Sequence, residues 1–398
     1  MLGFLKPAKL LRTLKDRTPL GLLQLKHDKT RLLTAIAGIA FADILIFMQQ
    51  GFADALYKSN TQYPRALQAD LILLSPQAKN FSRLRTFPRR RLYQAQDVPG
   101  VIAADSFMTA STEWRNPQTR KKASMLFIGQ NPDRPAFNIP EINEKIAITR
   151  QPDTFLFDKA ARGEYSEMIE EIQQTGSAQT EIGLRTVSVE GLFAVGASFG
   201  DDGALITSTQ NFLRLFPKRE AGMPNLGLLE VEDSYDLEKV KAALIDHLPE
   251  DVMVMTQPEY VEFEMNEITT NSPIGFVFTV GSAMGFIVGV VIVYQVLSTD
   301  VNSHLSEYAT FKAMGFRNSY LLGIVFEEAL ILSLLGFIPS VGVAMGIYQL
   351  TASATALPMA MTTGRAVMVF VLTLVMCGAS GAIATKRLQS ADPADIFS

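Results

Sequence analysis

The chain of 398 residues is 48% hydrophobic and only 19% charged, and its mean hydropathy is +0.16. This composition is more apolar and less charged than that of an average soluble protein, and it indicates a membrane protein with a sizeable soluble part. The formal net charge of −4 leaves no basic field for binding nucleic acid. The single cysteine, Cys377, excludes an intrachain disulfide and a metal site made of cysteines.

Four stretches have the roughly 20 largely apolar residues that a membrane-spanning helix requires. They are residues 32–52, 274–297, 320–350 and 366–384. The first stretch contains Asp43, which adds about 2.5–3.5 kcal/mol to its insertion free energy. Eight lysines and arginines against two aspartates precede the first span, so the positive-inside rule predicts a cytoplasmic N-terminus. With four spans, the C-terminus is then also cytoplasmic.

We therefore expect an α-helical membrane protein with four transmembrane helices and a large α+β extracytoplasmic domain inserted between helices 1 and 2. The predicted order is a cytoplasmic segment at 1–31, the first transmembrane helix at 32–55, the α+β domain at 56–270, the second helix at 271–298, a cytoplasmic helix at 299–319, the third helix at 320–350, a short outer loop at 351–365, the fourth helix at 366–385 and a cytoplasmic tail at 386–398. Within the first segment, residues 18–29 form either an interfacial helix or an extension of the first span.

The α+β domain is predicted from short β-like runs that are separated by turn residues. These runs are residues 69–76, 100–105, 124–129, 186–195, 226–231 and 251–256. Residues 236–248 have helical periodicity, with apolar side chains on one face. Residues 131–185 have no clear pattern, and we expect an inserted subdomain there.

The sequence lacks the usual enzyme motifs. Residues 196–200 (GASFG) fit the G-x-S-x-G pattern with Ser198 as nucleophile, but a β-like run follows instead of a helix, so a turn is the better interpretation. The three histidines lie in different segments, which leaves no paired spacing for a metal site. No Gly-Lys pair occurs, so the chain has no P-loop. We expect no catalytic residue, no metal and no cofactor on this chain, with any ATP and Mg²⁺ bound by a partner.

Small and acidic residues interrupt the apolar spans. Gly281, Gly285 and Gly289 are spaced four apart, which places them on one helix face for close packing within the chain or in a dimer. Asp43 and the adjacent Glu327 and Glu328 are polar residues within the spans, where carboxylates are usually paired or functional. We interpret the glutamates as structural or interfacial, with proton or substrate handling as the alternative.

A basic cluster without an intervening acid lies in the outer segment. It consists of Lys79, Arg83, Arg85, Arg89, Arg90 and Arg91. Such a cluster is compatible with contacts to anionic lipid headgroups, to an acidic substrate or to a partner protein, and also with a solvated loop.

A short amphipathic helix is predicted between the second and third spans. One face carries Val301, Leu305, Tyr308, Phe311 and Met314, and the opposite face carries Ser303, Glu307 and Thr310. Gly315 is well placed to end the helix. The apolar face is expected either to lie on the cytoplasmic surface of the membrane or to fit a groove in a partner.

Taken together, these features resemble the permeases of the MacB/FtsX superfamily of ABC transporters, and most closely the DevC-type permeases of cyanobacteria. The resemblance rests on residues 28–41 (DKTRLLTAIAGIAF), 69–76 (ADLILLSP), 306–321 (SEYATFKAMGFRNSYL), 327–336 (EEALILSLLG) and 387–397 (RLQSADPADIF). These segments occur at both ends of the chain and at the spans, whereas the outer domain is similar only at its strands.

The resemblance implies an inner-membrane homodimer in which each subunit binds a separate ABC ATPase. The helix between spans two and three would couple to that ATPase, and the residues implied are Leu305, Glu307, Tyr308, Phe311, Lys312 and Gly315. In the DevC branch the further partners are a periplasmic adaptor and, indirectly, a TolC-like outer-membrane duct, and the cargo is a glycolipid or another amphiphile. The alternatives are an FtsX-like mechanotransmitter that activates an envelope enzyme without moving cargo, and a membrane-anchored esterase that uses Ser198.

Overall fold

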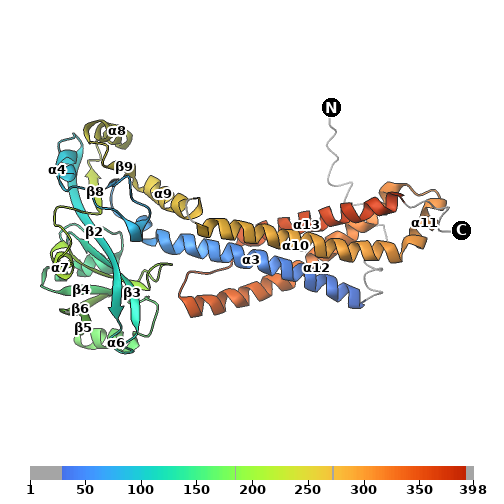
Figure 1. Cartoon of the computed structure of the whole chain (residues 1–398), viewed down its shortest axis with the longest axis horizontal. Coiled ribbons are helices and arrows are strands. Elements are labelled where there is room, and N and C mark those ends of the chain that lie inside the picture. The colour runs from blue at the N-terminus through green and yellow to red at the C-terminus, as the bar shows by residue number, and fades with distance from the viewer. Residues whose placement is uncertain (1–28, 184, 271–272, 391–398) are drawn as a thin grey trace. The chain divides into compact units, whose positions relative to one another are not determined.

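The computed structural model describes residues 29–183, 185–270 and 273–390 (Figure 1). Nearly all of the expected N-terminal segment and the end of the C-terminal tail lie outside these residues. The chain forms two compact units. One contains the described residues up to Gly51, those from Phe278 to Gln349, and those from Ala360 onward. The other contains Phe52–Val277 and Leu350–Met359.

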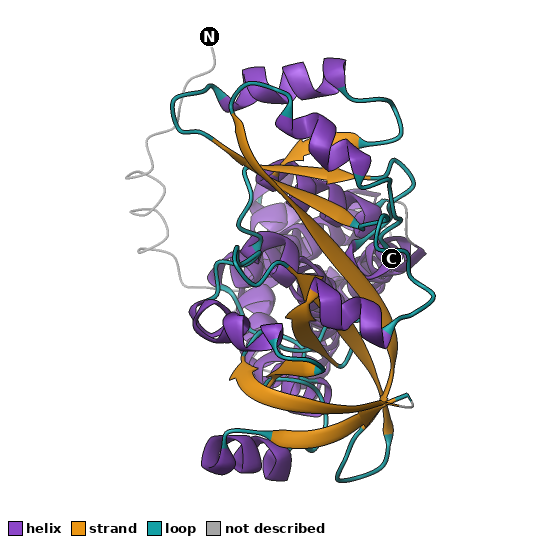
Figure 2. Ribbon diagram, turned by 90° about the vertical axis from the view of Figure 1, so that its left-hand side faces the viewer, coloured by secondary structure: helices purple, strands orange, loops and turns teal. Residues whose placement is uncertain are grey.

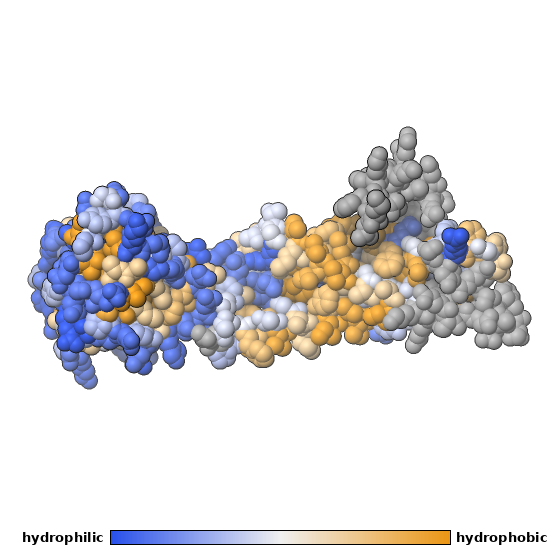
Figure 3. Space-filling view, turned by 90° about the horizontal axis from the view of Figure 1, so that it is seen from above, coloured by the Kyte–Doolittle hydropathy of each residue, from blue (hydrophilic) through white to orange (hydrophobic). Residues whose placement is uncertain are grey.

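The first unit is built from long helices that run beside one another (Figure 1). Among the described residues, four helices are long and apolar enough to cross a membrane. They are α3 (Lys29–Ala66), α10 (Pro273–Ser303), α12 (Asn318–Thr355) and α13 (Thr363–Ser390). The short helix α11 (Leu305–Ala313) lies between α10 and α12 in the sequence. Figure 3 shows apolar residues on the outward face of these helices, as a lipid environment requires.

The helices extend beyond the predicted spans. Helix α3 has 38 residues, which at about 1.5 Å per residue is far longer than a membrane needs, and its end after Gly51 belongs to the second unit. Helix α10 continues to Ser303, so residues 299–303 are part of α10, and the separate helix that was predicted at 299–319 is shorter than expected. The reason is that no glycine or proline occurs between residues 290 and 303 to end α10.

The second unit is a mixed α/β domain around a nine-stranded sheet with the order β5-β6-β4-β7-β3-β2-β8-β1-β9 (Figure 2). The strands are β1 (Leu71–Leu74), β2 (Val101–Arg115), β3 (Lys122–Gln130), β4 (Thr154–Asp158), β5 (Ala178–Ile182), β6 (Arg185–Phe193), β7 (Gly203–Ser208), β8 (Leu226–Val231) and β9 (Met253–Thr256). The pairs β3–β7 and β4–β6 are parallel, and the other neighbours are antiparallel. All six predicted β-like runs correspond to strands.

Strand β2 joins the two halves of this sheet. Its first part, Val101–Phe107, pairs with β8, and its second part, Met108–Arg115, pairs with β3. A register shift between Val101 and Ala103 bends the strand locally. The predicted run at 100–105 therefore identified only the beginning of a strand that is 15 residues long.

Residues 131–185 do not form the inserted subdomain that we expected. They contain α5 (Pro140–Lys145), the 3-10 helix η2 (Ile146–Arg150), β4, α6 (Ser166–Thr175) and β5. Strand β4 lies inside the sheet, between β6 and β7. Its five residues, TFLFD, are all buried, and its apolar run of three residues is too short to indicate a buried strand in the sequence.

Both faces of the sheet are covered, which explains the apolar character of the strands. On β1, Leu71 and Leu73 belong to one buried cluster, whereas Ile72 and Leu74 belong to another. The remaining helices are α4 (Arg90–Gln96), α7 (Thr209–Leu215), α8 (Leu237–His247), α9 (Gln257–Thr269) and the 3-10 helix η1 (Phe81–Arg83). The predicted helix at 236–248 corresponds to α8, which Asp236 caps through the N–H groups of Glu238 and Lys239.

A buried carboxyl group on α9 makes the stability of this domain depend on pH. The side chain of Glu264 is fully buried, and its Oε2 accepts a hydrogen bond from the Phe81 N–H at 3.0 Å. Burial raises the pKa of Glu264 to about 7, from an ordinary value of 4.5. The folded state therefore binds this proton more tightly than the unfolded chain does. The resulting stabilisation is complete below about pH 4.5 and is lost as the pH rises to about 7.

We expect Glu264→Gln to remove this pH dependence. The amide cannot ionise. At pH 8 the free energy of unfolding of the variant should therefore exceed that of the wild type by an amount on the order of 3 kcal/mol. Chemical denaturation of the full-length protein in detergent, measured between pH 4.5 and 8, tests this expectation. The exposed Glu262, replaced by Gln, is the matched control. If the free energy of unfolding of Glu264→Gln changed with pH as steeply as that of the wild type, the assignment of this pH dependence to Glu264 would be contradicted.

Candidate functional site

Helix α11 packs on the helix that follows it. The hydroxyphenyl group of Tyr308 is buried in one apolar cluster with Val301, Ile324 and Val325. Leu305 and Phe311 pack against the same cluster, and so does Tyr320 near the start of α12. The face that we expected to lie on the membrane or in a partner groove is therefore occupied by the protein's own α12. That expectation was wrong because the sequence pattern identifies an apolar face but not the surface that covers it.

The exposed side of α11 is mostly polar and consists of Ser306, Glu307, Thr310 and Ala313. The loop after α11 exposes Arg317 and also two large apolar side chains, Met314 and Phe316. Met314 is 60% exposed, so it does not belong to the buried face on which it was predicted. Gly315 has a φ of +91°, a left-handed conformation that favours glycine, and it follows the end of the helix as predicted. The side chain of Lys312 lies outside the described residues.

An ion pair and a second buried carboxyl group lie where α10 leads into α11. Arg31 Nη1 on α3 donates to Asp300 Oδ1 at 2.8 Å and to Ser303 Oγ at 3.0 Å. Asp300 is 4% exposed, and its backbone carbonyl contacts His304 Nδ1 at 3.1 Å. We had not singled out Arg31 or Asp300 from the sequence. A signal was present, because an aspartate that ends a long apolar helix needs a partner.

Glu328 on α12 brings a further carboxyl group into electrostatic contact with Asp300 and Arg31. Its side chain is fully buried, and neither of its oxygens has a hydrogen-bond donor in the structure. Glu327 is half-buried and points elsewhere on the helix, since adjacent residues are about 100° apart. The two glutamates therefore have different roles. Glu328, with Asp300 and Arg31, forms what we call the buried charge cluster, which joins α3, α10 and α12.

The three predicted packing glycines on α10, Gly281, Gly285 and Gly289, lie against neighbouring helices of the same chain. A Cβ atom on Gly285 would meet Ile46 Cγ1 at 3.2 Å, and one on Gly289 would meet Ala42 Cβ at 2.9 Å and also Met376 on α13. A Cβ on Gly281 would overlap the amide of Gln49. The glycine face is therefore used for packing α10 on α3 within one chain. This is the first of the two predicted alternatives, the other being packing between the two chains of a dimer.

We expect Gly289→Ala to destabilise the helical unit. The added methyl group would overlap Ala42 and Met376, and overpacking of this kind costs about 1–3 kcal/mol. Gly342→Ala on α12 is the matched control, because no atom lies within 4 Å of its added Cβ. Thermal unfolding in detergent should show a lower midpoint for Gly289→Ala and an equal or higher one for Gly342→Ala. Equal midpoints would argue against close packing at Gly289.

Asp43 is fully buried and bonded to two helices. Thr373 Oγ1 on α13 donates to Asp43 Oδ1 at 2.8 Å, and Ser340 Oγ on α12 donates to Oδ2 at 3.4 Å. Tyr348 also donates to the backbone carbonyl of Phe47, one turn further along α3. These contacts give Asp43 a structural position at the centre of the helical unit.

The predicted arginine cluster is divided by the structure. Arg91 is buried and forms a two-point ion pair with Asp251, with Nε–Oδ1 and Nη2–Oδ2 distances of 2.8 and 2.7 Å. It therefore fixes α4 and is unavailable to a headgroup or partner, which corrects our expectation for this residue. The arginines at 83, 85, 89 and 90 are exposed, and the Arg89 guanidinium lies 5.8 Å from the ring centre of Tyr93.

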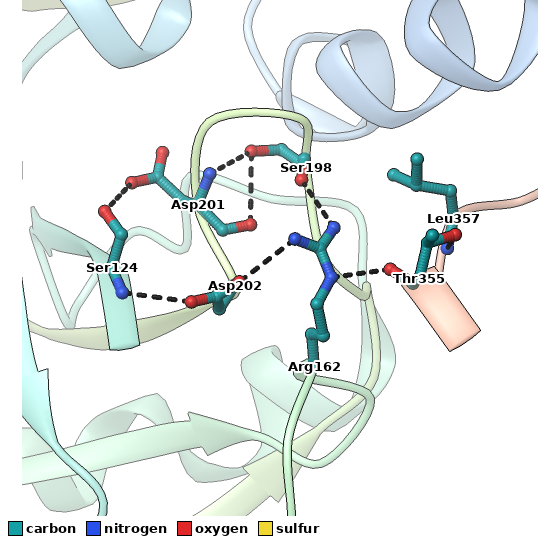
Figure 4. A network of polar contacts seen from close by, with 7 residues as sticks. All are labelled: Ser124, Arg162, Ser198, Asp201, Asp202, Thr355 and Leu357. Atoms are coloured by element: carbon teal, nitrogen blue, oxygen red, sulfur yellow. Dashed lines mark hydrogen bonds and ion pairs between the residues drawn. The ribbon is translucent and has the colours of Figure 1, made fainter. Parts of the chain in front are cut away.

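Ser198 belongs to a tight turn between two strands. Its Oγ accepts a hydrogen bond from the Asp201 N–H at 2.9 Å (Figure 4). Strand β7 follows the turn at Gly203, so the strand–turn–helix arrangement of a nucleophile elbow does not occur at these residues. The structure thus agrees with the interpretation of GASFG as a turn.

Two buried aspartates support this turn and the loop beside it. Asp158, at the end of β4, accepts backbone N–H bonds from Ala160, Val195 and Gly196 at 2.8–3.1 Å. Asp201 accepts hydrogen bonds from Ser82 Oγ at 2.9 Å and Ser124 Oγ at 3.2 Å. Burial raises the pKa of both carboxyl groups, and the hydrogen bonds oppose that shift. Both loops are therefore anchored to the core of the α/β domain.

Comparison with solved structures gives partial likenesses at low identity. The periplasmic region of MacB from Actinobacillus actinomycetemcomitans is 8% identical, with a TM-score of 0.33, and the match covers 50% of this chain and 93% of that one. The extracellular domain of the noncanonic ABC-type transporter YknZ from Gram-positive bacteria is 14% identical, with a TM-score of 0.31, and the match covers 47% and 99%. A search of curated protein sequences gave no significant match.

The sequence of the last three long helices matches a protein family. Residues 279–393 match the FtsX-like permease C-terminal family. This region includes most of α10 and all of α11, α12 and α13, and hence Asp300, Glu307 and Glu328. This match covers less than a third of the chain, and it shows that the C-terminal region is similar to the C-terminal domain of FtsX-like permeases.

Proposed function

We propose that this chain is the permease subunit of an ATP-driven tripartite exporter. A separate ABC ATPase hydrolyses ATP, with Mg²⁺, and moves α11, and the membrane helices transmit the motion to an extracytoplasmic α/β domain. Two copies of the chain form a homodimer in the inner membrane, with both termini in the cytoplasm. The domain acts on a periplasmic adaptor, and a glycolipid or another amphiphile leaves through an outer-membrane duct.

The observation that carries this proposal is the position of α11. It lies within the region that matches the FtsX-like permease family, between two helices long enough to cross a membrane. Its apolar side is fixed on α12, and its polar side, with Glu307, is exposed. A helix held in this way is suited to receive a force and pass it directly to α10 and α12. The printed sequence contains no P-loop, and on this proposal the force comes from a separate ATPase chain.

The polar residues of the helical unit support mechanical transmission rather than a path between the spans. Asp43 is held by Thr373 and Ser340, and Asp300 is held by Arg31. Their hydrogen bonds join helices, as the interior of a membrane protein requires. An amphiphile would therefore be moved by the extracytoplasmic domain.

Purification from the native membrane with ATP and an ATPase trap tests the proposal. We expect an ABC ATPase to co-purify and its hydrolysis rate to increase in the presence of this chain. Recovery of the chain without any ATPase under trapping conditions would contradict the proposal. The neighbouring reading frames supply a second test, because an exporter should have an adaptor encoded beside it.

An FtsX-like mechanotransmitter is the second candidate, since the family match covers FtsX-like permeases and does not specify cargo. It would use the same ATPase contact but would activate an envelope enzyme. A deletion strain separates the two candidates. Loss of enzyme activation with intact export favours the transmitter, whereas loss of export with normal enzyme activation favours the exporter.

A further inference from the structure

The C-terminal end of α12 is held by a residue of the α/β domain. Thr355 is the last residue of α12, and Ala356 after it has a φ of +53°, which ends the helix. The last carbonyl groups of a helix have no partner within the helix and carry its negative dipole end. The Nε of Arg162 donates to the Thr355 carbonyl at 2.5 Å (Figure 4). A cation thus caps the end of α12.

The guanidinium of Arg162 is held at two further points. Its Nη1 pairs with Asp202 Oδ1 at 3.0 Å, and its Nη2 donates to the Ser198 carbonyl at 3.2 Å (Figure 4). The planar guanidinium can make these three contacts at once because its N–H groups have a fixed fork geometry. The Arg162 backbone N–H also donates to the Asp202 carbonyl at 2.6 Å. The side chain is therefore oriented toward α12 before any load acts on it.

The support of Arg162 reaches the centre of the sheet. Asp202 Oδ2 accepts from the Ser124 N–H at 3.1 Å, and Ser124 is on β3. Asp158 and Asp201, which anchor the two loops around Arg162, are at most 3% exposed. A pull on the Thr355 carbonyl would therefore be resisted by β3 and β4 rather than by a mobile loop.

The loop after α12 packs with the same domain. Residues 350–359 belong to the α/β unit, and Leu357 and Met359 are only 9% and 7% exposed. Apolar side chains this well covered are unusual in a short connecting loop. The hydrogen bond from Arg162 thus lies beside a buried apolar contact, and the two together fix the end of α12.

We propose that Arg162 is a clamp through which α12 moves the α/β domain. On the proposed function, on which this inference rests, α3 and α10 lead into the domain through the chain itself. The clamp adds a third connection, between the C-terminal end of α12 and the α/β domain. The chain that follows α12 leads back into the membrane. Since α11 packs on the other end of α12, one helix would connect the ATPase contact to the Arg162 clamp.

Spin-label distances test the clamp without using the ATPase. Cys377 is buried and is the only cysteine, so labels can be placed at Glu171→Cys on α6 and Ala354→Cys at the end of α12, both exposed positions. We expect a narrow distance distribution in the otherwise unchanged protein and one at least twofold wider in Arg162→Ala. Arg214→Ala is the matched control, because Arg214 forms a similar ion pair, with Asp153 at 2.8 Å, that does not involve α12. An unchanged distribution in Arg162→Ala would overturn the clamp.

A second readout tests whether the clamp transmits motion. In the reconstituted complex, Arg162→Ala should lower the ratio of transport to ATP hydrolysis severalfold while the chain still binds the ATPase. Arg162→Lys should give an intermediate ratio, because it keeps the charge but not the three-point geometry. If Arg162→Ala widened the spin-label distance distribution but left the ratio of transport to ATP hydrolysis unchanged, the proposed role of Arg162 in transmitting motion would be overturned. If the wild-type chain binds no ATPase at all, the proposed function fails. The spin-label result alone then shows whether Arg162 fixes the end of α12.

Discussion

Arg31→Ala should destabilise the helical unit by about 3 kcal/mol, the lower end of the range for breaking a buried ion pair, since the Arg31 side chain is 19% exposed. The substitution removes the guanidinium from Asp300, and the His304 ring, with Nδ1 3.7 Å from Asp300 Oδ1, is the basic group that remains beside it. Glu328, which is buried and interacts electrostatically with Asp300, is itself acidic and cannot replace the lost cation. The measurement is the thermal midpoint of the full-length protein in detergent. Lys29→Ala, at an exposed position two residues earlier, is the matched control.

A rescue experiment distinguishes charge from packing in this cluster. If the loss arises from uncompensated carboxylates, Asp300→Asn in the Arg31→Ala background should recover part of the stability, because one negative charge is removed. If the loss arises from the missing volume of the arginine, Asp300→Asn should give no recovery. Equal midpoints for Arg31→Ala and Lys29→Ala would contradict the assignment of the cluster as a structural connection between α3 and α10.

Glu307→Arg should weaken binding of the partner ATPase about tenfold, which corresponds to roughly 1.4 kcal/mol, without lowering the stability of the chain. The side chain of Glu307 is exposed on α11 and is directed away from the cluster around Tyr308. A reversed charge should therefore affect only the partner. The measurement is the concentration of ATPase that gives half-maximal stimulation, with the thermal midpoint recorded in parallel.

Two further variants define the surface involved. Phe311→Asp should lower the thermal midpoint, because the Phe311 ring lies 5.6 Å from that of Phe316 and 6.4 Å from that of Tyr320. Glu171→Arg on α6 reverses a charge that is also exposed, in the α/β domain, and should leave stimulation unchanged. If Glu307→Arg bound the ATPase with the affinity of the wild type, the proposal that α11 contacts the ATPase would be contradicted.

Much of the architecture could be predicted from local patterns in the sequence. The four long helices, the strands at residues 69–76 and 226–231, and the helix at 236–248 were located correctly. Hydropathy and periodicity are properties of a short window of residues, so they can be read before the fold is known. Strand β4 was missed because its apolar run, Phe155–Phe157, has only three residues, which is too short for a window to identify a buried strand.

The candidate site depended on contacts between distant residues. Sequence reasoning identified α11 and Glu328 but assigned the apolar side of α11 to a membrane or a partner, and it grouped Arg91 with the exposed arginines. Tyr308 is buried by α12, and Arg91 is bound to Asp251, 160 residues away. A one-dimensional pattern shows that a side chain needs a partner, but it does not identify that partner.

The sequence by itself determined that this chain has helices able to span a membrane, a mixed α/β region between the first two of them, and no P-loop motif. These properties follow from composition, window hydropathy and short motifs, which do not depend on the fold. Only the tertiary structure decided which charges meet. Arg31 and Asp300 are 269 residues apart, and Arg162 and Thr355 are 193 residues apart. Their pairing depends on how helices and loops pack, because a hydrogen bond requires a geometry of a few ångströms that no local pattern encodes.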